Sequence, residues 1–143
     1  MSLITRVQML LLVLGAIAGC GVKAESFVSV SAPESAKLLE DPATFLLDVR
    51  THEEYDSGHL AQATLVPLHE LEGRLAELPP QKDRPFLIYC RSGNRSVSAA
   101  TILAKHGYTK VFNMKGGIKE WVQHKLPVNM KKGNETPGLR KER

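Results

Sequence analysis

The chain lacks a long apolar stretch, a strong charge of either sign and a pattern of metal ligands. Its uncharged N-terminal stretch, residues 7–22, is shorter than the ~20 residues that a membrane-spanning helix needs. The formal net charge of +4 is too small to require a nucleic-acid partner. The five histidines show no spacing typical of a metal site. We therefore expect neither a nucleic-acid partner nor a bound metal ion.

The first residues resemble a bacterial export signal. The run Met9–Leu14 is strongly apolar, and small residues follow it. The segment Ile17–Cys20 resembles a lipobox, in which a diacylglyceryl group is attached to the cysteine before cleavage. We therefore expect a lipoprotein-type signal peptide at residues 1–19 and an exported domain, anchored to a membrane on the periplasmic side through a lipid on Cys20. Ordinary cleavage after Ala24 and an uncleaved anchor are the alternatives.

Cysteine is nearly absent, because Cys20 and Cys90 are the only two. The chain that remains after residues 1–19 is long enough for one domain but not for two. If Cys20 is lipidated, no internal disulfide can form and Cys90 is the sole thiol in an oxidising compartment. A single thiol there is a liability unless its reactivity is used, which favours a catalytic Cys90 over a structural one.

Short apolar runs alternate with helical segments, which predicts an α/β fold with a parallel sheet covered on both faces. Ser31 and Glu34 form a capping box that begins the first helix, and Asp41-Pro42 stops it. The expected strands are Phe27–Val30, Phe45–Val49, Thr64–Val66, Phe86–Tyr89 and Lys110–Phe112. The other expected helices are His52–Asp56, Glu70–Glu77, Arg95–His106 and Gly117–His124.

Cys90 lies where a buried strand is expected to turn into the N-terminus of a helix. The loop Cys90–Ser96 contains one glycine and two arginines, so its backbone N–H groups can converge on a negative ligand. Such surroundings lower the pKa of a thiol from about 8.5 to roughly 3.5–7.5, which predicts a thiolate at neutral pH. Only four residues separate Cys90 from Arg95, whereas cysteine phosphatases need five. The smaller pocket suits a single sulfur atom better than a phosphoryl group.

This loop resembles the active-site loop of the rhodanese family of sulfurtransferases, whose single-domain members commonly carry Cys-Arg-Ser-Gly-x-Arg-Ser. Six further segments and one tryptophan resemble that family: Leu47–Arg50, Glu54-Tyr55, Gly58–Leu60, Leu65–Leu68, Asn113–Ile118, Trp121 and Leu126–Val128. The resemblance implies a single rhodanese-like domain over residues 26–128, with a central parallel five-stranded sheet. Residues 129–143 would form a basic, flexible tail. Ala61-Gln62-Ala63 departs from the Pro-Gly-Ala turn of many members.

The resemblance implies a thiosulfate sulfurtransferase with Cys90 as nucleophile and sulfur carrier. The thiolate would take the outer sulfur of thiosulfate or a similar anion, and the resulting persulfide would pass it to cyanide, a thiol or a protein thiol. Backbone N–H groups of the loop would bind the negative charge of the persulfide. No metal or organic cofactor is expected. The residues expected to bind substrate are Arg91, Ser92, Gly93, Asn94, Arg95 and Ser96, with Arg91 and Arg95 attracting the donor and Ser92 and Ser96 donating hydroxyl hydrogen bonds.

Four residues are expected to support the site without touching the substrate. Asp48 and Arg50 end a strand and are best interpreted as an internal ion pair. Gly116 and Gly117 would permit close backbone approach beside the loop. His59 is expected to be a hydrogen-bonded turn histidine.

Three alternative functions remain open at this stage. The first is a periplasmic sulfur carrier or binding module without turnover. A cysteine phosphatase and an arsenate reductase would use the same thiolate, but the spacing of Cys90 and Arg95 speaks against both.

Overall fold

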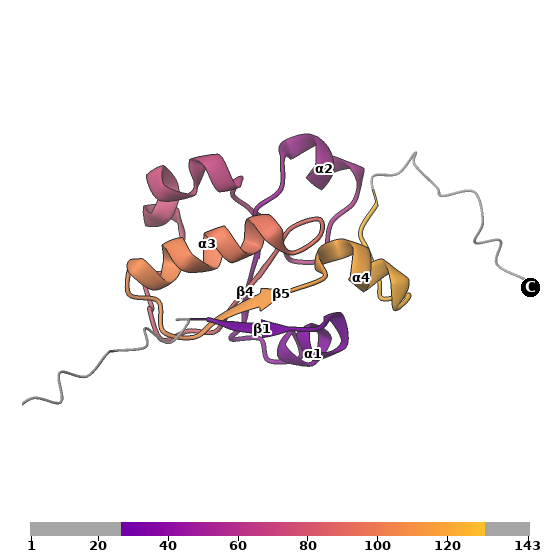
Figure 1. Ribbon diagram of the computed structural model, residues 1–143, viewed down its shortest axis with the longest axis horizontal. Coiled ribbons are helices and arrows are strands. Elements are labelled where there is room, and N and C mark those ends of the chain that lie inside the picture. The colour runs from indigo at the N-terminus through magenta and orange to yellow at the C-terminus, as the bar shows by residue number, and fades with distance from the viewer. Residues whose placement is uncertain (1–26, 131–143) are drawn as a thin grey trace, which may run out of the picture.

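The computed structural model describes residues 27–130 of the chain, and a parallel sheet forms the centre of this part (Figure 1). The sheet has five strands in the order β1-β5-β4-β2-β3, and every pairing is parallel. The strands are β1 (Val28–Val30), β2 (Phe45–Asp48), β3 (Thr64–Leu65), β4 (Phe86–Tyr89) and β5 (Val111–Met114). The predicted five-stranded parallel sheet is therefore confirmed.

Helices cover both faces of the sheet. They are α1 (Ala32–Leu38), α2 (His52–Ser57), the 3₁₀ helix η2 (Leu68–Glu77), α3 (Asn94–Lys105) and α4 (Gly117–Gln123). Helices α3 and η2 contribute to one cluster of buried apolar side chains, whereas α1 and α4 contribute to the other. Figure 1 shows α3 and α1 on opposite sides of the strands. This arrangement confirms the predicted α/β fold.

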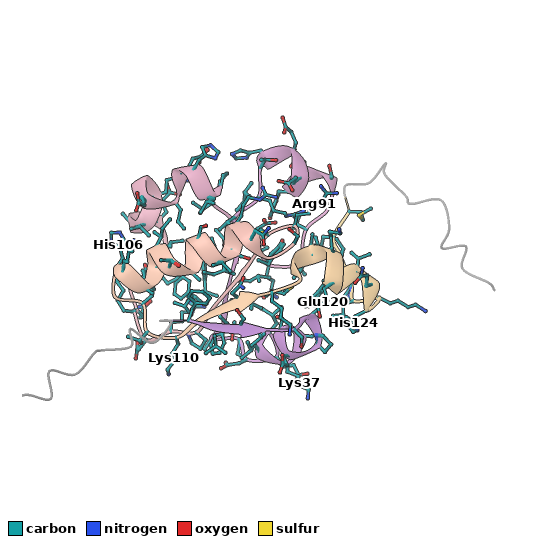
Figure 2. All side chains as sticks on the ribbon, in the orientation of Figure 1. Lys37, Arg91, His106, Lys110, Glu120 and His124 are labelled. Carbon is teal, nitrogen blue, oxygen red and sulfur yellow. The ribbon has the colours of Figure 1, made fainter. Side chains whose placement is uncertain are left out.

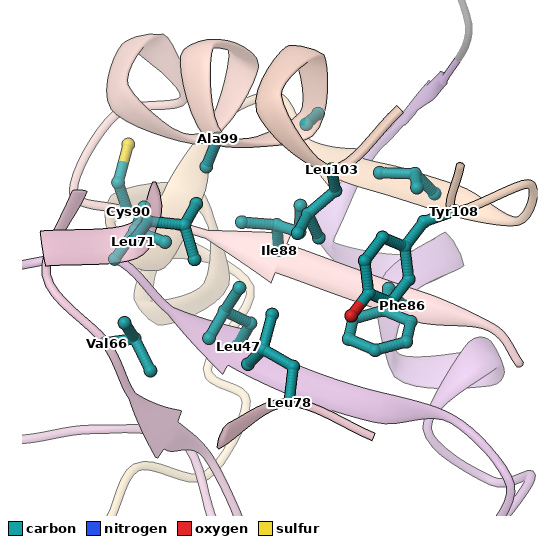
Figure 3. Close-up of a cluster of buried hydrophobic side chains, with 13 residues drawn as sticks. Leu47, Val66, Leu71, Leu78, Phe86, Ile88, Cys90, Ala99, Leu103 and Tyr108 are labelled. Carbon is teal, nitrogen blue, oxygen red and sulfur yellow. The ribbon is translucent and has the colours of Figure 1, made fainter. Parts of the chain in front are cut away.

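Strand β4 is buried on both faces, as its uninterrupted apolar character predicts. Phe86 and Ile88 belong to the cluster beneath α3, whereas Leu87 and Tyr89 belong to the opposite cluster, and all four are 0% exposed. Because alternate side chains of a strand point to opposite faces, Cys90 continues the row of Phe86 and Ile88. It lies at one end of their cluster with 1% of its surface exposed (Figure 3). The fold therefore places the thiol of Cys90 at the edge of the hydrophobic core.

Capping boxes begin α1 and α2. In the predicted box, Ser31 N donates to the Glu34 carboxylate at 2.7 Å and Glu34 N donates to Ser31 Oγ at 3.4 Å. Thr51 and Glu54 form a second box that begins α2, with corresponding distances of 3.1 and 3.3 Å. The same Ser/Thr-x-x-Glu pattern marks both boxes in the sequence, so the box at Thr51 adds to the one that we predict at Ser31.

Strand β5 extends beyond its predicted range. We expected Lys110–Phe112, and the strand runs over Val111–Met114. Asn113 pairs with Ser29 of β1 on one side and with Ile88 of β4 on the other. Asparagine is depleted in strands, so a pattern-based boundary stops short of it, whereas pairing on both sides extends the strand through it.

The helix predicted at Glu70–Glu77 was wrong in type, because the chain there is the 3₁₀ helix η2. Its backbone leaves helical geometry at Arg74, with φ −115° and ψ 15°. Gly73 directly precedes this kink, and glycine costs about 1 kcal/mol relative to alanine inside a helix. Leu71 nevertheless reaches the core with 0% exposure, so the apolar pattern was correct although the helix type was not.

The folded chain continues past the predicted boundary at residue 128. His59 and Asn129 exchange two backbone hydrogen bonds of 3.0 and 2.7 Å in an antiparallel bridge. The His59 ring stacks on Tyr55 at 3.8 Å between centroids, and its Nδ1 lies 2.9 Å from the Tyr55 carbonyl oxygen. His59 is thus the predicted turn histidine. Asn129, the first residue of the predicted tail, is therefore paired with the folded domain.

Several expectations concern residues that the structure does not describe. The signal segment 1–19, the lipid site Cys20 and residues 131–143 of the predicted tail all lie outside residues 27–130. Within the described range, no helix is long and apolar enough to cross a membrane. The same range holds no group of three or more His, Cys, Asp or Glu side chains that could bind a metal ion.

Candidate active site

The thiol of Cys90 lies inside a turn that joins β4 to α3. Gly93 precedes the helix with φ 100°, a left-handed conformation that glycine adopts at little cost. This turn directs the Gly93 N–H toward Cys90 Sγ at 3.1 Å. The Ser96 hydroxyl lies 3.5 Å from Sγ and 3.0 Å from the Gly93 carbonyl oxygen. Its single proton can be donated to only one of these acceptors at a time, and an ionised sulfur is the more strongly charged of the two.

The turn stabilises the ionised form of Cys90 even though the residue is buried. Burial alone would raise the pKa of the Cys90 thiol. Hydrogen bonds from the side chain and backbone of Ser96, and from the backbone N–H groups of Ser92 and Gly93, outweigh burial and lower this pKa below its ordinary value. The turn therefore favours the thiolate form of a sulfur that is almost excluded from solvent.

Two glycines allow the turn to pack against the connection between β5 and α4. An added Cβ at Gly93 would collide with the Lys115 carbonyl oxygen, and one at Gly117 would lie 2.5 Å from the Cys90 carbonyl oxygen. Gly117 thus has the predicted role beside the loop. At Gly116 an added Cβ would instead meet the side chain of Glu120. The close approaches at Gly93 and Gly117, unlike that at Gly116, let the start of α4 support the turn that holds Cys90.

The backbone of α4 holds the first two carbonyl groups of the turn. Ile118 N donates to the Cys90 carbonyl oxygen at 2.9 Å, and Lys119 N donates to the Arg91 carbonyl oxygen at 3.1 Å. With these carbonyl groups tied to α4, the N–H groups of the turn face the sulfur. The direction of the peptide units around Cys90 is therefore set by the neighbouring helix.

Arg95 is paired within the protein. Its two terminal nitrogens each lie 2.7 Å from an oxygen of Glu54, in a bidentate arrangement. This hydrogen bonding holds the pKa of Glu54 down at about 2. We expect Arg95, from the sequence, to attract the donor anion. Because its guanidinium is already paired with Glu54, Arg95 is less available for that role. No local sequence pattern indicates this partner, because Glu54 lies 41 positions away from Arg95.

Asp48 and Arg50 form the predicted internal ion pair. Arg50 Nη2 lies 2.6 Å from Asp48 Oδ2, and the two residues are 4% and 0% exposed. Arg50 also donates to the carbonyl oxygens of Glu54 and Gly58 at 3.2 and 2.8 Å. Its guanidinium carbon lies 5.4 Å from the centre of the Tyr89 ring. The pair thus joins the end of β2 to α2, the helix that carries the partner of Arg95.

The side chain of Arg91 faces a groove rather than a protein carboxylate. Within residues 27–130 it makes no hydrogen bond or ion pair, and it is exposed, as are Ser92 and Asn94. The groove has a volume of about 470 Å³ and lies between α2, α4 and the last described residues, so we term it the α2–α4 groove. Its lining residues are Arg50, Glu54, Ser57, Gly58, Arg91, Ile118, Lys119, Val122, Gln123, Val128 and Met130.

Cys90 thus lies in a turn of converging N–H groups at the carboxyl edge of a parallel sheet, an arrangement that can hold an anion or an ionised sulfur. The family model of the rhodanese-like domain matches residues 31–124. The chain therefore belongs to the rhodanese-like domain family.

Similar proteins support a transferase of the rhodanese superfamily. The chain is 40% identical over 94 residues to a sulfurtransferase of Allochromatium vinosum, covering 66% of this chain and 86% of that protein. It is 37% identical over 121 residues to thiosulfate sulfurtransferase 18 of Arabidopsis thaliana, covering 75% and 87%. The rhodanese-like domain of an Anabaena protein superposes with a TM-score of 0.68 at 26% identity, covering 80% of this chain and 88% of that one.

The buried ion pair yields a prediction for stability. Replacing Asp48 by Asn leaves the Arg50 charge buried without a counter-charge, so we expect Asp48→Asn to lower the free energy of unfolding by about 3 kcal/mol. Urea titration followed by circular dichroism measures this loss. Asp41→Asn is the control, because Asp41 is exposed and its carboxylate accepts only a local hydrogen bond from Ala43 N at 2.8 Å. Equal losses for the two variants would contradict the assigned role of Asp48.

The pairing of Glu54 predicts a pH dependence of stability. Because the pKa of Glu54 falls from 4.5 to about 2 on folding, its contribution is complete above pH 4.5 and is lost as the pH falls toward 2. We expect Glu54→Gln to cost roughly 1 kcal/mol at pH 7, because the pair is partly exposed. The difference from the unmodified protein should vanish near pH 2. Glu77→Gln, which removes a more exposed partner of Arg74, should have a smaller effect. A pH-independent difference for Glu54→Gln would refute the pairing.

Proposed function

We propose that this protein transfers sulfane sulfur from thiosulfate, or a similar sulfur anion, through a persulfide on Cys90. The observation that carries the proposal is the buried Cys90 sulfur with converging donors, the Gly93 N–H at 3.1 Å and the Ser96 hydroxyl at 3.5 Å. The similarity of the chain to thiosulfate sulfurtransferase 18 of Arabidopsis thaliana favours thiosulfate as the donor.

The proposed loading step is a displacement at sulfur. The Cys90 thiolate attacks the outer sulfur of thiosulfate, the sulfur–sulfur bond of the donor breaks, and its electron pair leaves with sulfite. The product is a Cys90 persulfide whose outer sulfur carries the negative charge. Backbone N–H groups of the loop, preorganised by α4, are suited to bind that charge. The step needs no added oxidant or reductant, and no proton must move once the thiol is ionised.

The two arginines of the loop have different proposed roles. Arg91 follows the nucleophile and has no protein counter-charge within the described residues, so it is free to attract the dianionic donor. Arg95 is held by Glu54 and therefore acts as a positioning residue that fixes the start of α3 to α2. The Ser96 hydroxyl can donate to Sγ when the sulfur is charged. We further propose that the lipoprotein-type signal places this chemistry outside the cytoplasm.

Substitution of the nucleophile tests the proposal. Cys90→Ser should lower thiosulfate:cyanide sulfurtransferase activity by at least about 10³-fold, because a neutral hydroxyl is a poor nucleophile and cannot hold sulfane sulfur. Intact-mass spectrometry of the unmodified protein after thiosulfate treatment should show a gain of about 32 Da, absent in Cys90→Ser. Ser98→Ala, an exposed change on α3, is the control and should leave both results unchanged.

The outcomes separate the candidate functions. An adduct with turnover supports the enzyme, whereas an adduct without turnover indicates a sulfur carrier. Absence of the adduct, or full activity in Cys90→Ser, would reject the persulfide mechanism. Hydrolysis of p-nitrophenyl phosphate by the unmodified protein would instead indicate a phosphatase.

A further inference from the structure

The α2–α4 groove has an apolar floor that the loading step does not require. Within residues 27–130, four large apolar side chains are exposed, and two of them, Val122 at 55% and Met130 at 45%, line this groove. Ile118 and Val128 lie in the same groove. A sulfur anion gains nothing from contact with such side chains, whereas an apolar residue of a partner would remove them from water. The groove is therefore suited to a ligand that has apolar groups, which a small inorganic donor lacks.

The groove is also positively charged. Among the described residues that line it, Glu54 is the only carboxylate, and Arg95 already neutralises it. Arg50 is likewise neutralised by Asp48. The side chains of Arg91 and Lys119 make no hydrogen bond or ion pair with the described residues, so their positive charges are not neutralised there. In Figure 2, Arg91 lies between α2 and α4, far from Lys110 at the opposite end of the sheet. An occupant with negative charge would be complementary to this site.

The groove is continuous with the catalytic turn. Arg91 belongs to both, and the residues that line the floor begin at Ile118, whose N–H holds the Cys90 carbonyl oxygen at 2.9 Å. Cys90 itself is only 1% exposed. An acceptor must therefore extend a narrow group to the persulfide while the rest of it lies outside the turn. A cysteine side chain projecting from a peptide has this shape.

We infer that the α2–α4 groove binds the cysteine-bearing segment of an acidic protein, which accepts sulfur from Cys90. Apolar residues beside the acceptor cysteine pack on Val122 and Met130, and acidic residues further out pair with Arg91 and Lys119. This inference rests on the proposed persulfide function. It names the class of acceptor and the surface that selects it, with Lys119 and Val122 as specificity-determining residues.

The transfer step is balanced without a further reactant. The thiolate of the partner cysteine attacks the outer sulfur of the Cys90 persulfide and forms a new sulfur–sulfur bond. The bond between the outer sulfur and Cys90 Sγ breaks, and its electron pair returns to Sγ as a thiolate. The partner leaves as a persulfide, and the proton of its thiol has gone to solvent before the attack.

Single-turnover transfer from the loaded protein tests the inference. The protein is first treated with thiosulfate, its adduct of about 32 Da is verified, and unloading by cyanide is measured. The acceptors are then an acidic peptide with leucines beside its cysteine and aspartates at both ends, a basic peptide with lysines instead, and N-acetylcysteine amide. Rate constants are compared per ionised thiol, because charge also changes the pKa of each acceptor thiol. We expect the acidic peptide to exceed the other two by about tenfold or more.

Groove variants locate the effect. Lys119→Gln should lower transfer to the acidic peptide by about threefold to fivefold, and Val122→Glu by about tenfold, while loading by thiosulfate and unloading by cyanide stay unchanged. Lys110→Gln is the charge-matched control, because Lys110 is exposed and directly precedes β5, at the end of that strand opposite the α2–α4 groove (Figure 2). Val28→Glu is the control for the apolar position, since Val28 is exposed to the same 55% as Val122.

The outcomes distinguish this inference from the proposed function. If Cys90 loads and cyanide unloads it, but the acidic peptide is no better than N-acetylcysteine amide, the acceptor is a small free thiol and the inference is overturned while the persulfide function stands. Equal losses of loading and of transfer in Lys119→Gln would assign this cation to the donor and also overturn it. If the protein forms no adduct with thiosulfate, both the persulfide function and this inference are rejected.

Discussion

The site depends on the convergence of N–H and hydroxyl donors on one buried sulfur. Cys90 is 1% exposed, and burial of this kind normally favours a neutral thiol. The donors of the turn reverse that preference and lower the pKa of Cys90. A thiolate without a water shell is a strong nucleophile, and the same donors can stabilise the negative outer sulfur of a persulfide. Ionisation and the proposed storage of sulfur thus have one structural cause.

Neighbouring elements keep those donors in place. The left-handed Gly93 and the close approach at Gly117 allow the turn to rest on the start of α4, whose N–H groups hold its carbonyl oxygens. On the other side, Arg95 and Glu54 join α3 to α2, and Arg50 with Asp48 joins α2 to the sheet. These two ion pairs therefore stabilise the turn on the side of α2. Because Arg95 is paired, Arg91 is the exposed arginine of the loop whose side chain has no partner among the described residues.

Much of this arrangement could be predicted from local sequence. The unbroken apolar run of β4 and the residues from Cys90 to Arg95 predicted the buried strand, the turn and the place of the thiol between them, because each depends on neighbouring residues. The pairing of Arg95 with Glu54 and the α2–α4 groove could not be predicted, since they depend on how α2, α4 and the chain near Met130 meet in space. The helix type of η2 and the end of β5 were also wrong in the prediction. Gly73 precedes the kink in η2, and pairing on both sides extends β5 through Asn113.

The pH dependence of Cys90 alkylation by iodoacetamide tests the central claim most directly. Alkylation is slow for a buried sulfur, so the midpoint of the profile rather than its absolute rate carries the information. The account predicts a midpoint below about 8.5, the value of an unperturbed thiol, and a shift to higher pH in Ser96→Ala, which loses one of the donors to sulfur. A midpoint at or above that value, unchanged in Ser96→Ala, would contradict it.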